Sequence, residues 1–141
     1  MPMDNAASFR IDGKPQGKGR PRFTRSGHTY TPDSTAEYEQ RVKLAYRLSG
    51  APKLTGSISA DIRAVFAVPK SYTKKERSAA LALHFAPRKP DCDNIAKIIL
   101  DALNGLAYDD DAQVVRLHVE KCYGEAAYVA VELKGGINAP D

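Results

Sequence analysis

The sequence predicts an α/β or α+β fold in which helices cover a mixed β-sheet, as a single domain over residues 1–141. Three observations indicate this fold. Apolar and polar residues alternate in several short segments, as in strands with one buried face. Between these segments, apolar residues recur every three to four positions, as in amphipathic helices. The 141 residues suffice to bury roughly 68–70% of the surface of the chain around one core.

The first strand is expected over residues 8–12, where the alternation ends at Gly13. A segment rich in glycine, proline and basic residues follows, and residues 32–50 then show helical periodicity. Ser34 and Glu37 have the spacing of a capping box, which marks a helix start. The beginning of the chain is therefore expected to provide a strand, a basic loop and a helix.

The middle of the chain contains the strongest strand pattern. Residues 58–68 alternate apolar and polar side chains, which predicts a long strand. Thr73 and Glu76 repeat the capping-box spacing at the start of a second helix. That helix has to end before Pro87, because proline lacks the N–H that a helix interior requires.

A third helix is expected from about Asp93 to the stop signal at residues 104–105. Residues 115–119 and 129–133 then alternate as two strands, and the tail from about Gly135 is expected to fray. The order strand, helix, strand, helix, helix, strand, strand is typical of a mixed sheet, but it does not order the strands within that sheet.

Composition narrows the class of protein. No apolar run resembles a signal peptide, and no stretch approaches the roughly 18 apolar residues of a membrane helix. We therefore expect a cytoplasmic protein with no membrane partner. Cys92 and Cys122 are too few for a disulfide framework and lack the spacing of zinc ligands, so both are expected to be reduced thiols.

Charge is divided unevenly along the chain. Residues 1–90 contain 17 Lys and Arg against 7 Asp and Glu, whereas residues 91–141 contain 4 against 10. A basic body around an acidic pocket is the layout that a nuclease requires, because the basic residues attract phosphates by counterion release. The alternative interpretation is that these charges only solvate the surface.

Acidic side chains are concentrated within residues 91–111. Two unit charges about 4 Å apart repel by roughly 4 kcal/mol at an effective dielectric constant of about 20. Converging carboxylates therefore need a cation, and oxygen ligands suit Mg²⁺ or Mn²⁺. The acids of this window are Asp91, Asp93, Asp101, Asp109, Asp110 and Asp111.

The first acids of the window lie where the third helix is expected to begin. If the chain is extended there, Asp91 and Asp93 lie on one side of it and face one ion. Lys97 follows Asp93 by four residues and precedes Asp101 by four, so an exposed ion pair worth about 0.3–0.5 kcal/mol is one interpretation. The other is an ammonium that stabilises charge on a phosphate during cleavage. Asp101 is expected to pair with Lys97 or an arginine rather than to bind metal.

The acids at residues 109–111 also have two interpretations. Aspartate is favoured in turns, so the run is one candidate for a turn. Because it lies between the helix stop at Gly105 and a strand, it is also placed to return a carboxylate to the start of the third helix. Composition does not choose among the three acids.

Basic residues are concentrated in the loop after the first strand, interleaved with glycine and aromatic residues. Such a segment can follow a nucleic-acid backbone with its charges and stack its aromatic rings on bases, although a solvated basic hairpin is the alternative. Two further basic residues directly precede Asp91, where they would hold a phosphate beside the metal. The candidate nucleic-acid-binding residues are Lys14, Lys18, Arg20, Arg22, Arg88 and Lys89.

Other motifs are excluded. An EF-hand starting at Asp91 fails because Ala96 and Ala102 stand where glycine and glutamate are required. No phosphate-binding loop of the G-x-x-x-x-G-K-[ST] type and no nucleophile elbow is present. The scattered histidines are given no catalytic role.

The pattern D-x-D-N-x-x-K from Asp91, D-A-L-N-G from Asp101 and D-D-x-Q-V from Asp110 closely resembles the RusA family of Holliday junction resolvases. The firm part of the resemblance spans residues 87–115, and the basic loop at residues 13–22 matches more loosely. The resemblance implies a homodimeric, Mg²⁺-dependent endonuclease that nicks paired strands at four-way DNA junctions in recombination and repair. Such proteins occur in bacterial genomes and their prophages.

Carried over by position, the resemblance implies that Asp91, Asp93 and Asp111 are the metal-binding catalytic acids. Asp110 is then an adjacent metal-binding helper and Lys97 the catalytic lysine. Two other classes of protein stay open: a nuclease for other branched DNA or RNA, and a metal-independent nucleic-acid-binding protein whose acids only form a turn.

Overall fold

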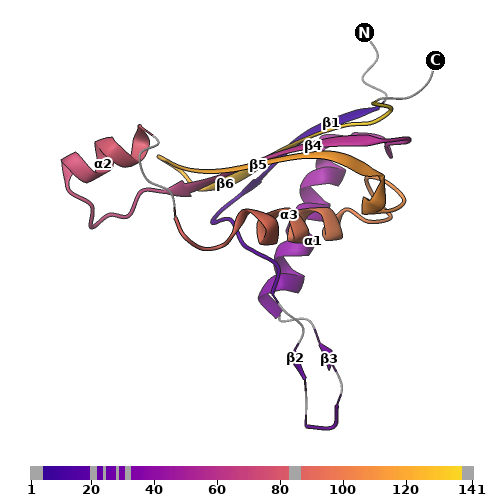
Figure 1. Cartoon of the computed structure of the whole chain (residues 1–141), viewed down its shortest axis with the longest axis horizontal. Helices are drawn as coiled ribbons and strands as arrows, with labels where there is room; N and C mark the ends of the chain where they lie inside the picture. Colours follow the sequence, from indigo (N-terminus) through magenta and orange to yellow (C-terminus); the bar gives the residue numbers. More distant parts are fainter. Residues whose placement is uncertain are drawn as a thin grey trace.

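The computed structural model describes residues 5–19, 22–23, 25–27, 29–30, 33–82 and 87–137. The predicted order of helices and long strands is confirmed, with a short hairpin and one 3₁₀ turn added (Figure 1). In chain order the elements are β1 (Ala6–Asp12), β2 (Arg22–Phe23), β3 (Thr29–Tyr30), α1 (Asp33–Ser49), β4 (Ile58–Ala67), α2 (Lys74–Leu81), α3 (Cys92–Ala102), η1 (Asp111–Gln113), β5 (Val114–Gly124) and β6 (Tyr128–Lys134).

The four long strands form a mixed sheet in the order β1-β6-β4-β5. β6 pairs antiparallel with β1 and with β4, whereas β4 and β5 are parallel. The crossover between the parallel strands contains α2 and α3, as a parallel connection requires. Figure 1 shows α1 and α3 against one face of the sheet, with α2 beyond its end and the β2–β3 hairpin extending away. The predicted α+β fold with a mixed sheet is confirmed, and α1 and α3 cover one face of the sheet.

The core lies between the sheet and the two covering helices. Alternate residues of β4 are buried, including Ile58 and Ile62, both at most 1% exposed. On α3 the buried residues follow helical spacing, with Ile95 and Ile99 fully enclosed. Tyr108 is also enclosed, and its hydroxyl donates to the carbonyl of Leu100 at 2.7 Å. These contacts with the core therefore fix the position of α3, and this helix carries the first acids of the sequence motif.

One of the two predicted capping boxes is present. Thr73 caps α2 through the predicted capping box, accepting from the backbone N–H of Glu76 at 3.1 Å while its own N–H donates back at 2.9 Å. The capping box predicted at Ser34 is wrong, because α1 already includes Asp33 and places Ser34 inside its first turn. None of the helices that the structure describes is long and apolar enough to cross a membrane.

The two outermost segments of the described chain lie side by side. Ala6 pairs with Lys134 at the end of the β1–β6 ladder, and the backbone N–H of Gly135 donates to the carbonyl of Asn5 at 2.7 Å. The described part of the tail, up to Ile137, continues to form backbone hydrogen bonds. The remaining tail lies outside the described residues.

Candidate active site

Asp91 and Asp93 lie at the start of α3. Asp91 is the N-cap residue, with extended backbone angles (φ −71°, ψ 155°), and its side chain makes no capping hydrogen bond. Asp93 lies in the first helical turn, and both residues are exposed. The two acids therefore do not share one extended segment, because the helix begins between them at Cys92. The Lys89–Pro90 peptide bond before them is cis.

Two of the three acids at residues 109–111 have partners in or near the turn. The carboxylate of Asp109 lies 2.6 Å from the Lys53 ammonium on the surface. Asp110 caps η1, accepting from the backbone N–H of Ala112 at 2.8 Å. The side-chain oxygen of Gln113 accepts from the backbone N–H groups of both acids, at 2.9 and 3.1 Å. The turn interpretation thus holds for the run, since η1 begins at Asp111 and Gln113 binds the backbone of the two preceding acids.

Asp111 is held differently, by Asn104 at the end of the third helix. Its backbone N–H donates to Asn104 Oδ1 at 2.8 Å, and Asn104 Nδ2 donates to Asp111 Oδ2 at 3.4 Å. Burial raises the pKa of the Asp111 carboxyl, and the nearby Asp101 and Asp110 carboxylates raise it further, while the Asn104 hydrogen bond opposes them. Ionisation of Asp111 is therefore disfavoured in the absence of a cation.

Asp93, Asp101 and Asp111 line one groove between α3 and the start of β5. Lys97 lies in the same groove, with its ammonium 3.6 Å from Asp101 Oδ2 and its side chain 61% exposed. The predicted pairing of Asp101 with Lys97 is confirmed. The full lining is Asp93, Ala96, Lys97, Leu100, Asp101, Asp111, Val114, Val115, Arg116 and Leu117.

Asp91 does not line this groove and instead lines a separate hollow. Basic side chains of the loop after β1 and of the segment before α3 surround it there. This hollow is lined by Lys14, Pro15, Gln16, Gly17, Lys18, Lys89, Pro90, Asp91 and Asn94. Asp91 and Asp93 thus lie at the N-terminal end of α3, with basic residues on the Asp91 side. Asp111 adjoins Asn104 just beyond the C-terminal end of the helix, so the expectation that residues 109–111 return a carboxylate to the helix start is wrong.

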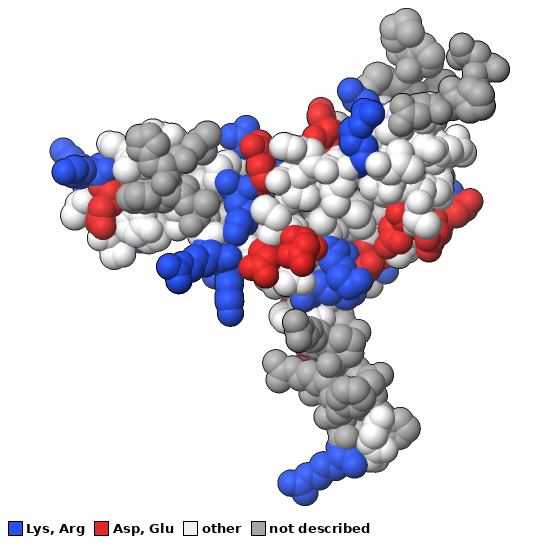
Figure 2. All heavy atoms as spheres, in the orientation of Figure 1, with Lys and Arg blue, Asp and Glu red and all other residues white. Residues whose placement is uncertain are grey.

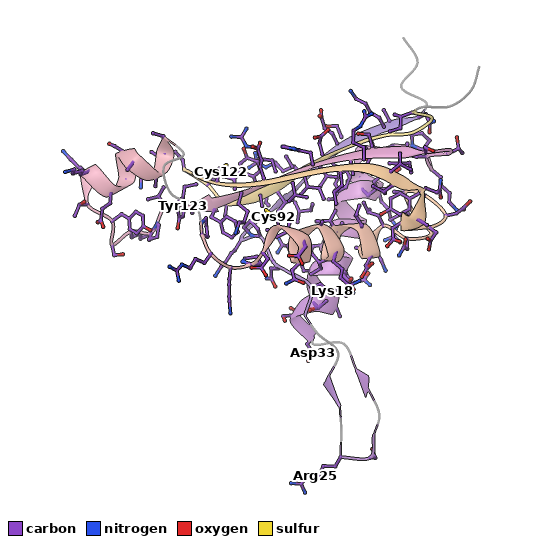
Figure 3. All side chains as sticks on the ribbon, in the orientation of Figure 1. Lys18, Arg25, Asp33, Cys92, Cys122 and Tyr123 are labelled. Atoms are coloured by element: carbon purple, nitrogen blue, oxygen red, sulfur yellow. The ribbon has the colours of Figure 1, made fainter. Side chains whose placement is uncertain are left out.

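Lys18 was expected to contact nucleic acid, but the structure gives its ammonium two carboxylate partners. Its Nζ lies 2.7 Å from Glu39 Oε2 on α1 and 3.3 Å from Asp101 Oδ2 on α3. Burial lowers the pKa of Lys18, and the two carboxylates outweigh that effect and raise it overall. Figure 3 labels Lys18 close to α1 and α3. Lys18 thus holds the loop to both helices and neutralises one wall of the acidic groove.

The backbone of the same loop is fixed to the two helices. The N–H of Lys18 donates to the carbonyl of Asn94 at 3.0 Å, and the N–H of Gly19 donates to Thr35 Oγ1 at 3.0 Å. Gly17 passes so close to the α3 start that a Cβ added to it would lie 2.8 Å from Pro90 Cβ and 3.1 Å from Asn94 Cβ. Only glycine allows this approach without displacement, so the loop and the acids form one unit.

Three of the other predicted DNA-binding residues, Lys14, Arg88 and Lys89, are exposed. The ammonium of Lys121 donates to the carbonyls of Pro87 and Arg88, at 2.7 and 3.2 Å, and so fixes the backbone that leads to Asp91. Figure 2 shows Lys and Arg atoms next to Asp and Glu atoms on the helix side of the sheet.

The last two predicted DNA-binding residues are Arg20 and Arg22. Arg20 lies outside the described residues, and of Arg22 the structure describes the backbone in β2. Arg25, at the hairpin tip, is exposed and is labelled in Figure 3 at the end farthest from the sheet.

Sequence reasoning missed two parts of this site. Asn104 was interpreted only as a helix stop, although its amide positions Asp111. The contact of Lys18 with Glu39 and Asp101 joins residues far apart in the chain, and no local pattern signals it.

The residue types present fit a hard divalent cation. The candidate ligands are carboxylates, the donors that Mg²⁺ and Mn²⁺ prefer. The Asp91 carboxylate has no capping hydrogen bond, and the crowding of Asp111 against Asp101 is the repulsion that a cation would relieve. Within the described part of the chain, no three His, Cys, Asp or Glu side chains already converge as a set of metal ligands.

The similarity of this chain to known proteins covers nearly all of its helices and strands. A family model described as "Endodeoxyribonuclease RusA" matches residues 12–134, from the end of β1 to the end of β6. An uncharacterized protein of Bacillus subtilis (strain 168), YqaN, is 38% identical over 133 residues, which cover 89% of this chain and 94% of the relative. Both matches extend over far more of the chain than the acidic motif alone.

Proposed function

Because the chain belongs to the RusA family of endodeoxyribonucleases, we propose that it is a Mg²⁺-dependent nuclease that resolves Holliday junctions by paired phosphodiester hydrolysis, in DNA recombination and repair. The observation that carries the proposal is the groove in which Asp93 and Asp111 lie, next to the hollow that contains Asp91. Exposed basic residues beside these acids are suited to hold the phosphates of the substrate.

Asp91, Asp93 and Asp111 would hold one or two Mg²⁺ ions, with Mn²⁺ as a possible substitute and Asp110 as an adjacent helper. When bound, such ions activate water and stabilise the leaving oxygen of a phosphodiester. The protein's part is to orient the carboxylates. Asn104 orients Asp111 by two hydrogen bonds, and packing of α3 fixes the helical turn that bears Asp93.

Lys97 is proposed to act on the phosphate directly. Its side chain is 61% exposed and its contact with Asp101 is a long 3.6 Å, so little free energy opposes its turning toward a bound phosphate. An ammonium in that position stabilises the charge that develops during cleavage. Lys14, Arg88 and Lys89 are proposed to hold the neighbouring phosphates.

The test is incubation of the purified protein with a mobile four-way junction, with Mg²⁺ or with EDTA, beside linear duplex, fork and flap substrates. We expect cutting of the junction with Mg²⁺ only. Asp91→Asn and Asp93→Asn should abolish cutting while retaining or tightening DNA binding, because fewer acids repel phosphate less. Asp109→Asn is the matched control and should cut normally, since Asp109 pairs with Lys53 on the surface.

Two results would contradict the proposal. Cutting that persists in EDTA would exclude a metal-dependent reaction, and a loss of binding equal to the loss of cutting would remove Asp91 and Asp93 from catalysis. If forks, flaps or RNA are cut in preference to the junction, the four-way junction is not the preferred substrate.

The protein is further proposed to be a homodimer that joins through β5. This strand forms one edge of the sheet, and it exposes Val115 (55%) and Leu117 (47%). An edge strand with exposed apolar residues is a template for pairing with another chain. Figure 2, in which β5 faces the viewer, shows a mainly uncharged surface there.

Charge complementarity favours a second copy as the partner. If two β5 strands pair antiparallel about a two-fold axis at His118, Arg116 of each copy lies opposite Glu120 of the other, and Leu117 lies opposite Val119. Opposite charges and apolar pairs on neighbouring strands are each stabilising. A homodimer of this kind would give two active sites for the two strands of a junction.

A further inference from the structure

We propose that α2 and the turn before it (residues 69–82, called the α2 arm) bind the backbone of a duplex arm of the junction, away from the cleaved phosphate. The inference rests on the proposed function, because it takes branched DNA as the substrate. It adds a second contact surface that the sequence motifs do not include.

The α2 arm carries three cations that the protein itself does not neutralise. Lys70, Lys74 and Lys75 are exposed, and no ion pair within the described residues engages them. The nearest acid, Glu76, accepts from the backbone of the helix start, and Arg77 is paired with Glu125. The arm therefore presents a local positive charge to solvent.

Helix stability does not account for the placement of these lysines. Lys74 and Lys75 occupy the first turn of α2, where the helix dipole disfavours cations. Acidic residues at the same positions would stabilise the helix by about 0.3–1 kcal/mol each. The positive charge thus lowers the stability of α2. A bound phosphate backbone is the partner that would offset this loss.

The arm is attached firmly enough to present these charges in a fixed place. The Tyr72 and Tyr123 rings pack edge to face with centroids 6.1 Å apart, and Arg77 pairs with Glu125 beyond the end of β5. Ala80 is fully buried. Figure 3 labels Tyr123 at the end of the sheet next to α2. Lysines on a fixed helix lose less entropy on binding than lysines on a mobile loop.

The location of the arm fits DNA that leaves the active site. Figure 1 shows α2 beyond the end of the sheet, and the chain returns from it to the start of α3. On this return, the exposed Arg88 and Lys89 directly precede Asp91. In Figure 2, Lys and Arg atoms occur at the outer end of α2 and again between α2 and the acids. Because a duplex carries one charge per roughly 1.7 Å of its axis, a continuous arm would reach several of these residues.

The test compares the variant Lys70→Gln/Lys74→Gln/Lys75→Gln with wild type in junction binding over a range of salt concentrations, in EDTA. Each lost phosphate contact should reduce the slope of log K against log salt by about 0.9, so a total reduction of about 2–3 is expected. The rate of cutting at saturating junction with Mg²⁺ should not change, because none of the three lysines lines the groove or the hollow. Circular dichroism checks that the variant is folded.

The matched control is Lys43→Gln/Arg47→Gln/Lys134→Gln, which removes the same charge from α1 and from the end of β6. Its slope should equal that of wild type. An unchanged slope in the α2 variant, an equal reduction in the control, or a fall in saturating rate without a change of slope would each overturn the inference. If no junction is cut with any divalent ion, the proposed function fails, while the comparison of slopes still decides the role of the arm.

Discussion

Asp111 shows how neighbouring residues select one acid from a run of three. Burial and the carboxylates of Asp101 and Asp110 raise its pKa, so its folded-state pKa lies above the unfolded value. A raised carboxyl pKa contributes stability at low pH, and that contribution is lost as the pH rises through the raised pKa. At neutral pH without metal, the ionised Asp111 therefore destabilises the fold.

We predict that Asp111→Asn abolishes cutting but raises the melting temperature at pH 7 in EDTA, because it removes a repelled charge. The gain should shrink as the pH falls through the raised pKa toward about 3.9, the ordinary aspartate value. Adding Mg²⁺ should raise the melting temperature of wild type more than that of the variant. Calorimetry across pH, with and without Mg²⁺, measures all three effects.

Asp109→Asn is the control for this experiment, since Asp109 is paired with Lys53. It should not raise the melting temperature at pH 7. If Asp111→Asn melts below wild type at pH 7 in EDTA, the ionised Asp111 carboxylate does not destabilise the fold and the prediction is wrong.

The sequence alone was able to identify the acids but not their separate roles. Local reasoning left the three residues of 109–111 equivalent, and only the family resemblance favoured Asp111. Their differences come from Lys53, Asn104 and Gln113, whose contacts span up to 56 residues of chain. The Lys53 contact depends on tertiary structure, so no local pattern contains it. The contacts of Asn104 and Gln113 are local, and Asp110 with Gln113 forms a capping box whose spacing the sequence does contain.

Among the elements, the loop after β1 has one side chain, Lys18, that forms ion pairs with both α1 and α3. Lys18 is 20% exposed and Glu39 17%, so their contact is shielded from water better than a surface pair. A hydrogen bond to a charged group under these conditions contributes about 1.5–3 kcal/mol.

We predict that Lys18→Met lowers the free energy of unfolding by about 1–3 kcal/mol, because it leaves Glu39 without its cation and Asp101 with only the longer contact to Lys97. Urea unfolding of Lys18→Met, Glu39→Gln and the double variant would measure the coupling. The two losses should be less than additive by about 1 kcal/mol. Strict additivity would show that the contact contributes nothing in solution.

Local sequence patterns predicted the elements well and their arrangement poorly. Alternation and periodicity identified β4 and α3 nearly to their ends, because one face of each is buried. The order β1-β6-β4-β5 did not follow, since pairing of β4 with both a parallel and an antiparallel neighbour is decided by packing across the whole sheet. The capping box at Ser34 failed for a smaller reason: a helix that begins at Asp33 leaves Ser34 no capping role.

For the whole molecule, the proposed dimer depends on the edge strand β5. We predict that Leu117→Glu converts a dimer into a monomer, because it places one charge in each of the two apolar pairs between the strands. Sedimentation velocity measures the change. The monomer should nick single strands but lose paired cutting of a junction.

Leu48→Glu on α1 is the matched control, since Leu48 is even more exposed (78%) but lies outside the sheet. It should leave the sedimentation coefficient unchanged. A wild-type protein that is monomeric at micromolar concentration, or a Leu117→Glu variant that stays dimeric, would exclude this interface.

The hydrogen bond between Gly135 and Asn5 has a practical consequence for engineering. Because these two positions adjoin at the far end of the sheet from α2, a short peptide linker could join them in a circularly permuted chain. New termini could then be opened at the exposed tip of the β2–β3 hairpin, at Gly27. A fluorophore attached there would report directly on nucleic acid approaching from that side.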